Sequence, residues 1–167
     1  MGIALLSRQR RTPRNDRGRV MKDLYFEDVH VGEKIIVGQH VVDREGMIEF
    51  ARMWDPQVFH LDEAAAGAYH DGLLASSNYT MCVVTRVIGL NWHIRTFGVM
   101  EYKEIKVHAP VRPGDILTVS MEWVDKRASR SKPDRGVVLS RVEVRNQRDE
   151  LALSYVSTIM MMRRGDG

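Results

Sequence analysis

The sequence predicts an α+β fold, because segments with helical character come first and strand-like runs follow them. Helices are expected over residues 44–55, 63–69 and 72–91, and strands over 97–108, 115–124, 136–145 and 151–162. Short turns separate the strand-like runs, which favours antiparallel pairing, since parallel strands need long crossovers. A length of 167 residues and an apolar content of 44% fit one domain with a single core.

The first predicted helix has recognisable start and stop signals. Asp43 is its expected N-cap, and Pro56 ends it. The residue before a proline is disfavoured in the α region, so Asp55 should lie in extended backbone. His60 is expected in the same loop, and Asp62 should cap the short Ala-rich helix that follows. This region therefore presents a carboxylate and an imidazole in a loop between two helices.

The last predicted helix is strongly apolar. Gly72 is expected to open it, and Arg86 is its only charged residue. This composition predicts burial on most sides, so the strands should wrap the helix. Cys82 lies within it and is interpreted as a small buried hydrophobe rather than a nucleophile.

The strand-like runs carry two local signals. Residues 115–124 alternate between apolar and polar side chains, as expected of a strand with one buried face. In the run before it, the apolar phase slips between Tyr102 and Ile105. This slip predicts a β-bulge.

The net charge of +3 is unevenly distributed. Residues 1–20 contain six arginines and one aspartate, a net charge of +5, which leaves −2 for the rest of the chain. A mildly acidic body argues against nucleic acid as the partner, since such binding needs a basic folded surface. We expect a disordered basic tail over 1–20 and a single domain over 21–165. A targeting peptide, or a start assigned upstream of Met21, are the alternatives for the tail.

Several classes of protein are disfavoured by what the sequence lacks. It has one cysteine, no Cys/His cluster with metal-ligand spacing, no glycine-rich nucleotide-binding motif and no apolar run long enough to cross a membrane. We therefore expect a cytoplasmic protein without a metal or other cofactor.

Four ordered motifs resemble the MaoC-like dehydratases, the relatives of (R)-specific enoyl-CoA hydratases. They are Asp55-Pro56-Gln57-Val58-Phe59-His60-Leu61-Asp62, Asp71-Gly72-Leu73-Leu74-Ala75-Ser76, Val111-Arg112-Pro113-Gly114-Asp115 and residues 129–136. The resemblance covers about residues 22–163. It implies a hot-dog fold, in which an antiparallel sheet curls around one long helix, and a homodimer or higher homo-oligomer with active sites near the interface.

The resemblance also implies an activity and site residues. Asp55 and His60 would hold the water that is added to, or lost from, the double bond of an enoyl thioester of coenzyme A or acyl carrier protein. Gly72 would donate its backbone amide to the thioester oxygen, and the Thr80 hydroxyl would orient Asp55. The chain would then be a hydro-lyase of fatty acid metabolism.

Two departures from the family pattern leave the acyl group open. Pro56 directly follows Asp55, whereas hydratases often carry Asn-Pro just before the histidine. Asp71 precedes Gly72, where relatives usually have glycine or histidine.

The remaining assignments have alternatives. Arg130, Lys132 and Arg135 are candidates for contacts with the phosphates of coenzyme A, and a solvated hairpin turn explains them as well. For Asp55 and His60 the alternative is a turn-forming aspartate and a structural histidine. For the whole chain the alternatives are a non-catalytic acyl-CoA-binding protein and a thioesterase. The thioesterase is disfavoured because residues 73–91 carry no carboxylate.

Overall fold

The computed structural model describes residues 22–165, so the expected tail and Met21 lie outside the described residues. The helices are α1 (Arg44–Trp54), α2 (Val58–Leu61), α3 (Glu63–His70) and α4 (Ser77–Asn91), with a short 3-10 turn, η1 (Phe26–Asp28). The main strands are β2 (Lys34–Val41), β4 (Thr96–Val107), β5 (Ile116–Ala128), β6 (Arg135–Arg145) and β7 (Leu151–Met162). The short strands β1 (Asp23–Leu24) and β3 (His93–Ile94) pair in parallel.

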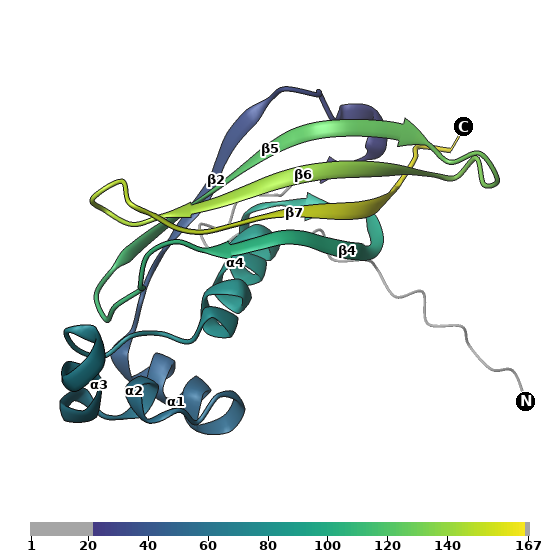
Figure 1. Cartoon of the computed structure of the whole chain (residues 1–167). Helices are drawn as coiled ribbons and strands as arrows, with labels where there is room; N and C mark the ends of the chain where they lie inside the picture. Colours follow the sequence, from purple (N-terminus) through teal and green to yellow (C-terminus); the bar gives the residue numbers. More distant parts are fainter. Residues whose placement is uncertain (1–21, 166–167) are drawn as a thin grey trace, which may run out of the picture.

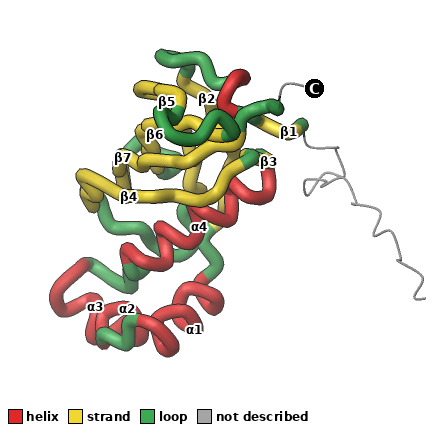
Figure 2. The backbone as a smooth tube through the Cα atoms, turned by 90° about the vertical axis from the view of Figure 1, so that its right-hand side faces the viewer, coloured by secondary structure: helices red, strands yellow, loops and turns green. Residues whose placement is uncertain are grey.

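The main sheet has the order β2-β5-β6-β7-β4, and all four of its pairings are antiparallel, as predicted. It curves over α4, while α1, α2 and α3 form a separate group beneath the start of that helix (Figures 1 and 2). This arrangement confirms the predicted α+β fold with one helix against a curved sheet.

The core lies between α4 and the inner face of the sheet. Val83, Val84 and Val87 of α4 are buried against alternating strand residues such as Val119 and Met121. The alternation predicted for residues 115–124 is therefore confirmed. Gly38 lets β2 approach the helix, because a Cβ there would lie 2.7 Å from Asn91 Nδ2.

The predicted bulge in β4 is also confirmed. The register with β7 shifts between Lys103 and Lys106, and Glu104 has a φ of 52°. β4 is an edge strand of the described sheet, and six of its large apolar side chains are 44–61% exposed: Phe97, Val99, Met100, Tyr102, Ile105 and Val107.

Two predictions for the long helix are wrong. It begins at Ser77 rather than Gly72, because Asp71 (φ 55°) and Gly72 (φ 111°) adopt left-handed backbone that cannot belong to an α-helix. Cys82 is exposed, since one side of α4, which also carries Arg86, is left uncovered by the described residues. Within the part of the chain that is described, no helix is long and apolar enough to span a membrane.

Candidate active site

The corner between α1 and α2 presents Asp55. Asp55 is the C-cap of α1, its amide donating to Ala51 O at 2.9 Å, and its φ of −153° lies outside the α region, as its position before Pro56 predicts. Gln57 then caps a single turn of helix, α2, in which the Asp62 amide donates to Val58 O at 2.9 Å. His60 therefore lies in this one-turn helix and not in a loop, which corrects the prediction.

Two donors hold the carboxylate of Asp55. The hydroxyl of Ser76 donates to Oδ2 at 2.6 Å, and the side-chain amide of Gln57 donates to Oδ1 at 3.1 Å. The Ser76 hydroxyl first, and the Gln57 amide second, hold the pKa of the Asp55 carboxyl below its ordinary value of 3.8. Ser76 is also the N-cap of α4, so the positive end of that helix adds to the stabilisation of the anion. Asp55 is thus a carboxylate at neutral pH.

A backbone carbonyl fixes the imidazole of His60. Nδ1 lies 2.8 Å from Leu74 O, and a carbonyl oxygen only accepts hydrogen bonds, so Nδ1 carries the proton. Nε2 then faces Asp55 Oδ2 at 3.5 Å, beyond the usual length of a direct hydrogen bond. The His60 side chain is 6% exposed, whereas the Asp55 side chain is 20% exposed. Water can therefore reach the pair from the side of the Asp55 carboxylate.

The structure gives the supporting hydroxyl to Ser76 and not to Thr80. Thr80 is buried, and its Oγ1 lies 3.5 Å from Ser76 O rather than beside Asp55. The sequence does contain a signal for Ser76, since serine is a favoured N-cap, but using that signal requires knowing where α4 starts.

Gly72 lies in the turn between α3 and α4. In the described part of the chain its amide donates no hydrogen bond, whereas the next amide, Leu73 N, donates to Glu63 Oε1 at 3.2 Å. A Cβ at Gly72 would lie 3.0 Å from the same Glu63 oxygen, so the position requires glycine for both φ and space. Gly72 therefore offers an unengaged amide, at a turn rather than at a helix N-terminus.

A search of protein-family models and a search of curated proteins each found no match. Solved structures do match. The chain is similar to a MaoC-like dehydratase from Rhodospirillum rubrum, with 32% identity and a TM-score of 0.76 over 84% of this chain and 98% of that one. The chain belongs to the MaoC-like dehydratase family.

Two other solved structures share the fold of this MaoC-like protein. A monoamine oxidase regulatory protein from Archaeoglobus fulgius is 26% identical, with a TM-score of 0.75 over 87% of this chain and 99% of that one. A conserved hypothetical protein from Mycobacterium tuberculosis with a double hotdog fold is 20% identical, with a TM-score of 0.73 over 87% of this chain and 46% of that one. The predicted hot-dog fold is thereby confirmed.

A cavity of about 340 Å³ lies between the second half of α4 and strands β4, β6 and β7 of the MaoC-like domain. Its walls are mostly apolar. Three of its lining residues are small: Gly89 on α4, and Ser140 and Ser157 on the sheet, whose hydroxyls are hydrogen-bonded to each other. Trp92, at the end of α4, also lines this cavity. A smaller hollow of about 40 Å³ lies nearer to Asp55, between Leu74, Thr80 and strand β4.

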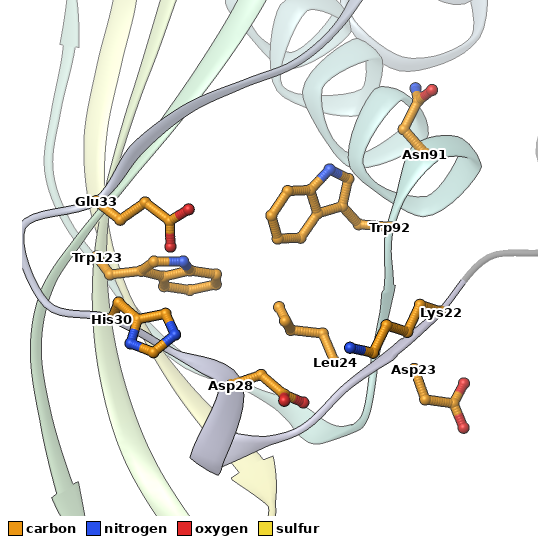
Figure 3. A pocket seen from close by; sticks show the side chains of 9 residues that line it. All are labelled: Lys22, Asp23, Leu24, Asp28, His30, Glu33, Asn91, Trp92 and Trp123. Carbon is orange, nitrogen blue, oxygen red and sulfur yellow. The ribbon is translucent and has the colours of Figure 1, made fainter.

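A second cavity, of about 390 Å³, lies at the far end of α4 (Figure 3). Its apolar lining includes Trp92 and Trp123, and Asp28, His30 and Glu33 are among its polar lining residues. None of its lining residues belongs to the Asp55 site. Among the described residues no cluster of His, Cys, Asp and Glu has the arrangement of a metal site.

The structure does not bring the basic loop to Asp55 within one chain. Arg130 and Lys132 lie in the turn between β5 and β6, at the end of the sheet opposite to α1–α3 (Figure 1). Arg135 is occupied by the Asp134 carboxylate at 2.8 Å, and its guanidinium stacks on Phe97, 4.0 Å from the ring centre.

Proposed function

We propose that this MaoC-like protein adds water to, or removes it from, the α,β double bond of an enoyl thioester of coenzyme A or acyl carrier protein. The observation that carries the proposal is the pairing of an ionised Asp55 with a tautomerically fixed His60, with Oδ2 and Nε2 3.5 Å apart. In a structural ion pair, a protonated Nε2 would donate to the carboxylate. Here Leu74 O holds the proton on Nδ1, so an unprotonated acceptor nitrogen faces the carboxylate instead.

The two acceptors suit one water molecule. A water at about 2.8 Å from both atoms would donate one hydrogen to Asp55 Oδ2 and one to His60 Nε2, leaving its lone pairs for the β-carbon. The Asp55 carboxylate already accepts hydrogen bonds from Ser76 and Gln57, whereas His60 Nε2 carries no proton and has no other partner among the described residues, so His60 Nε2 takes the proton. As the water oxygen bonds to the β-carbon, the α-carbon gains that proton from His60. Dehydration follows the same steps in reverse.

Attack on the β-carbon builds negative charge on the thioester oxygen. The unengaged amide of Gly72 supports the assignment of this residue as the donor to that oxygen, together with the N-terminal end of α4. A preorganised donor of this kind contributes roughly 10²- to 10³-fold in rate.

The apolar cavity supports a place for the acyl chain. Thr80 lies in the hollow beside the site, and Thr85 lines the cavity of about 340 Å³ further along the same helix. Five residues of α-helix span about 7.5 Å, a distance that a medium-length acyl chain crosses easily. We therefore propose that acyl groups longer than crotonyl extend along α4 into this cavity.

A second copy of the chain would complete the site. The exposed apolar side chains of β4, on an unpaired sheet edge, support a homodimer formed through this strand, because such edges are usually covered. If two β4 strands pair antiparallel, the Thr96 end of one copy lies opposite the Val107 end of the other. The β5–β6 turn of the second copy, with Arg130 and Lys132, would then approach the Asp55 site and could meet the phosphates of coenzyme A.

The dimer has its own test. Val99→Arg places a charge on the β4 edge and should halve the mass measured by light scattering, with loss of activity. Ile36→Arg is the matched control, because Ile36 is 73% exposed on the other edge strand. Equal masses for the wild type and Val99→Arg would exclude this interface.

The alternative function is a non-catalytic acyl-CoA-binding protein, and the similarity to a protein described as regulatory supports it. A thioesterase is less well supported, since α4 carries no carboxylate. The enzyme and the binding protein differ in their response to Asp55→Asn. This variant should abolish hydration of trans-2-enoyl-CoA esters, measured by loss of enoyl-thioester absorbance, while acyl-CoA binding persists. Asp43→Asn is the control, because asparagine caps α1 equally well. A folded wild type that binds these esters without turning any of them over would support the binding protein.

A further inference from the structure

We propose that Arg112 is a positioning residue of this site: it holds the turn between α3 and α4 so that the Leu74 carbonyl keeps His60 in the Nδ1–H tautomer. The effect on turnover rests on the proposed function, whereas the effect on the tautomer does not.

One guanidinium faces four successive carbonyls. Arg112 Nη1 donates to Asp71 O at 3.2 Å and to Gly72 O at 3.1 Å, with Leu73 O at 3.5 Å, and Nη2 donates to His70 O. His70 is the last residue of α3, so the charge also lies at the negative end of that helix. A planar fork of donors can serve several acceptors at once, which a lysine ammonium on a flexible stem does poorly.

The same segment anchors the chain on the other side of Leu74. Val111 O accepts a hydrogen bond from Ala75 N at 2.8 Å. The Leu74 carbonyl that holds His60 therefore lies between two anchors, the Arg112 side chain before it and the Val111 carbonyl after it. Both anchors belong to one dipeptide, so its position sets the position of that carbonyl.

Arg112 is itself held by the sheet. Its amide donates to Asp115 Oδ2 at 2.8 Å, and the other oxygen of this buried carboxylate accepts from Gln147 Nε2 at 3.0 Å. Gln147 belongs to the β6–β7 turn, so the anchor extends from the sheet to the candidate site. These bonds fix the backbone of Arg112, from which the side chain reaches the turn.

The turn needs such an anchor because its backbone is unfavourable. Asp71 has a φ of 55°, which costs free energy in a residue with a Cβ. Without the guanidinium, four carbonyls would lose a donor and the turn could relax. Leu74 O would then move away from Nδ1, and His60 would be free to carry its proton on Nε2. A protonated Nε2 can no longer accept a proton from water.

The test measures the tautomer directly. Nitrogen-15 NMR of the imidazoles, with the His60 signal assigned from its absence in His60→Asn, should show the Nδ1–H pattern in the wild type and a mixture in Arg112→Ala. If Arg112→Ala does not fold, Arg112→Lys gives the same measurement with the stem and the charge retained. Arg148→Ala is the matched control, because Arg148 faces Asp115 at 3.6 Å without reaching the turn, and it should keep the wild-type pattern.

Activity gives a second readout. Arg112→Ala should lower kcat about 10²-fold, as small misplacements of catalytic groups do, with a smaller change in KM. Guanidinium ion, at concentrations far below those that unfold proteins, should restore part of kcat in Arg112→Ala and none in Arg148→Ala. An unchanged Nδ1–H pattern in a folded Arg112 variant overturns the inference, whatever happens to kcat. A wild type that is inactive on every enoyl thioester refutes the proposed function instead, and the tautomer measurement still decides the role of Arg112.

Discussion

The hydroxyl of Ser76 is expected to set the ionisation of Asp55, and Ser76→Ala tests this. The bond to Oδ2 is 2.6 Å long, the usual length for a hydroxyl that donates to a carboxylate. A hydrogen bond to a charged group contributes about 1.5–3 kcal/mol. Because the Asp55 side chain is 20% exposed, water replaces part of the lost bond, and we take the lower end of that range. Loss of this bond therefore raises the pKa of Asp55 back toward its ordinary value of 3.8.

The same substitution should lower stability in a pH-dependent way. Ser76 caps α4 through Asn78 N at 3.2 Å, and loss of an N-cap costs about 1 kcal/mol. The pKa of Asp55 in the folded protein is below the ordinary value of 3.8, so its contribution is present above 3.8 and is lost as the pH falls through the folded pKa. Ser76→Ala should therefore cost about 2.5 kcal/mol at neutral pH and about 1 kcal/mol once Asp55 is protonated.

Carbon-13 NMR titration of the Asp55 carboxyl and urea unfolding at two pH values measure these quantities. Ser77→Ala is the control, since Ser77 is the exposed first residue of α4 and its loss leaves the bond to Asp55 in place. A carboxyl pKa that is the same in the wild type and in Ser76→Ala would refute the reasoning. It would mean that the field of the helix end, and not the hydroxyl, stabilises the anion.

Four further predictions concern the core, the stability of α4, the cavity and pH. Gly136→Ala should destabilise the fold by about 1–3 kcal/mol in urea unfolding, because its Cβ would lie 2.4 Å from the Phe26 ring. Gly89→Ala, whose Cβ meets no atom within 4 Å, should instead stabilise α4 by up to about 1 kcal/mol. Gly89 lines the cavity of about 340 Å³, so Gly89→Leu should fill part of it and lower kcat/KM for long-chain enoyl-CoA more than for crotonyl-CoA. An equal loss for both substrates would contradict the proposed acyl role of that cavity. Burial, and then the charge of Arg86, lower the pKa of His40 from 6.5. The free energy of unfolding of the wild type should therefore decrease as the pH falls below 6.5. If the same decrease persists in His40→Gln, other groups cause it.

Local signals predicted much of the fold. Asp43 and Asp62 cap their helices as expected, accepting from Gly46 N and Ala65 N at 2.7 Å each. The alternation along β5 and the bulge in β4 also follow from short stretches of sequence. These features depend on residues within a few positions of one another, which is why a single sequence is enough to find them.

The start of α4 was mispredicted because it depends on distant residues. Residues 72–76 have the apolar composition of the helix that follows, and Leu73 is indeed buried at 2% exposure. The contacts that keep this segment out of the helix come from Val111 and Arg112, roughly 40 positions along the chain. Periodicity cannot reveal such contacts, and for the same reason the predicted supporting hydroxyl is that of Thr80 rather than that of Ser76.

The spacing of Asp55 and His60 does not by itself produce a site. A proline-ended helix fixes the backbone of one, a single helical turn fixes the other, and the segment before α4 orients both through Ser76 Oγ and Leu74 O. Ser76 uses its one O–H to donate to Asp55 and a lone pair to accept from Asn78 N. Helix start and carboxylate ionisation are therefore coupled through one oxygen. Threonine at this position would keep both bonds, whereas aspartate would keep the cap and bring a second negative charge against Asp55. Position 76 must therefore both cap α4 and donate a hydrogen bond to Asp55. A variant that separates these two roles would have to supply the donor and the acceptor from different atoms.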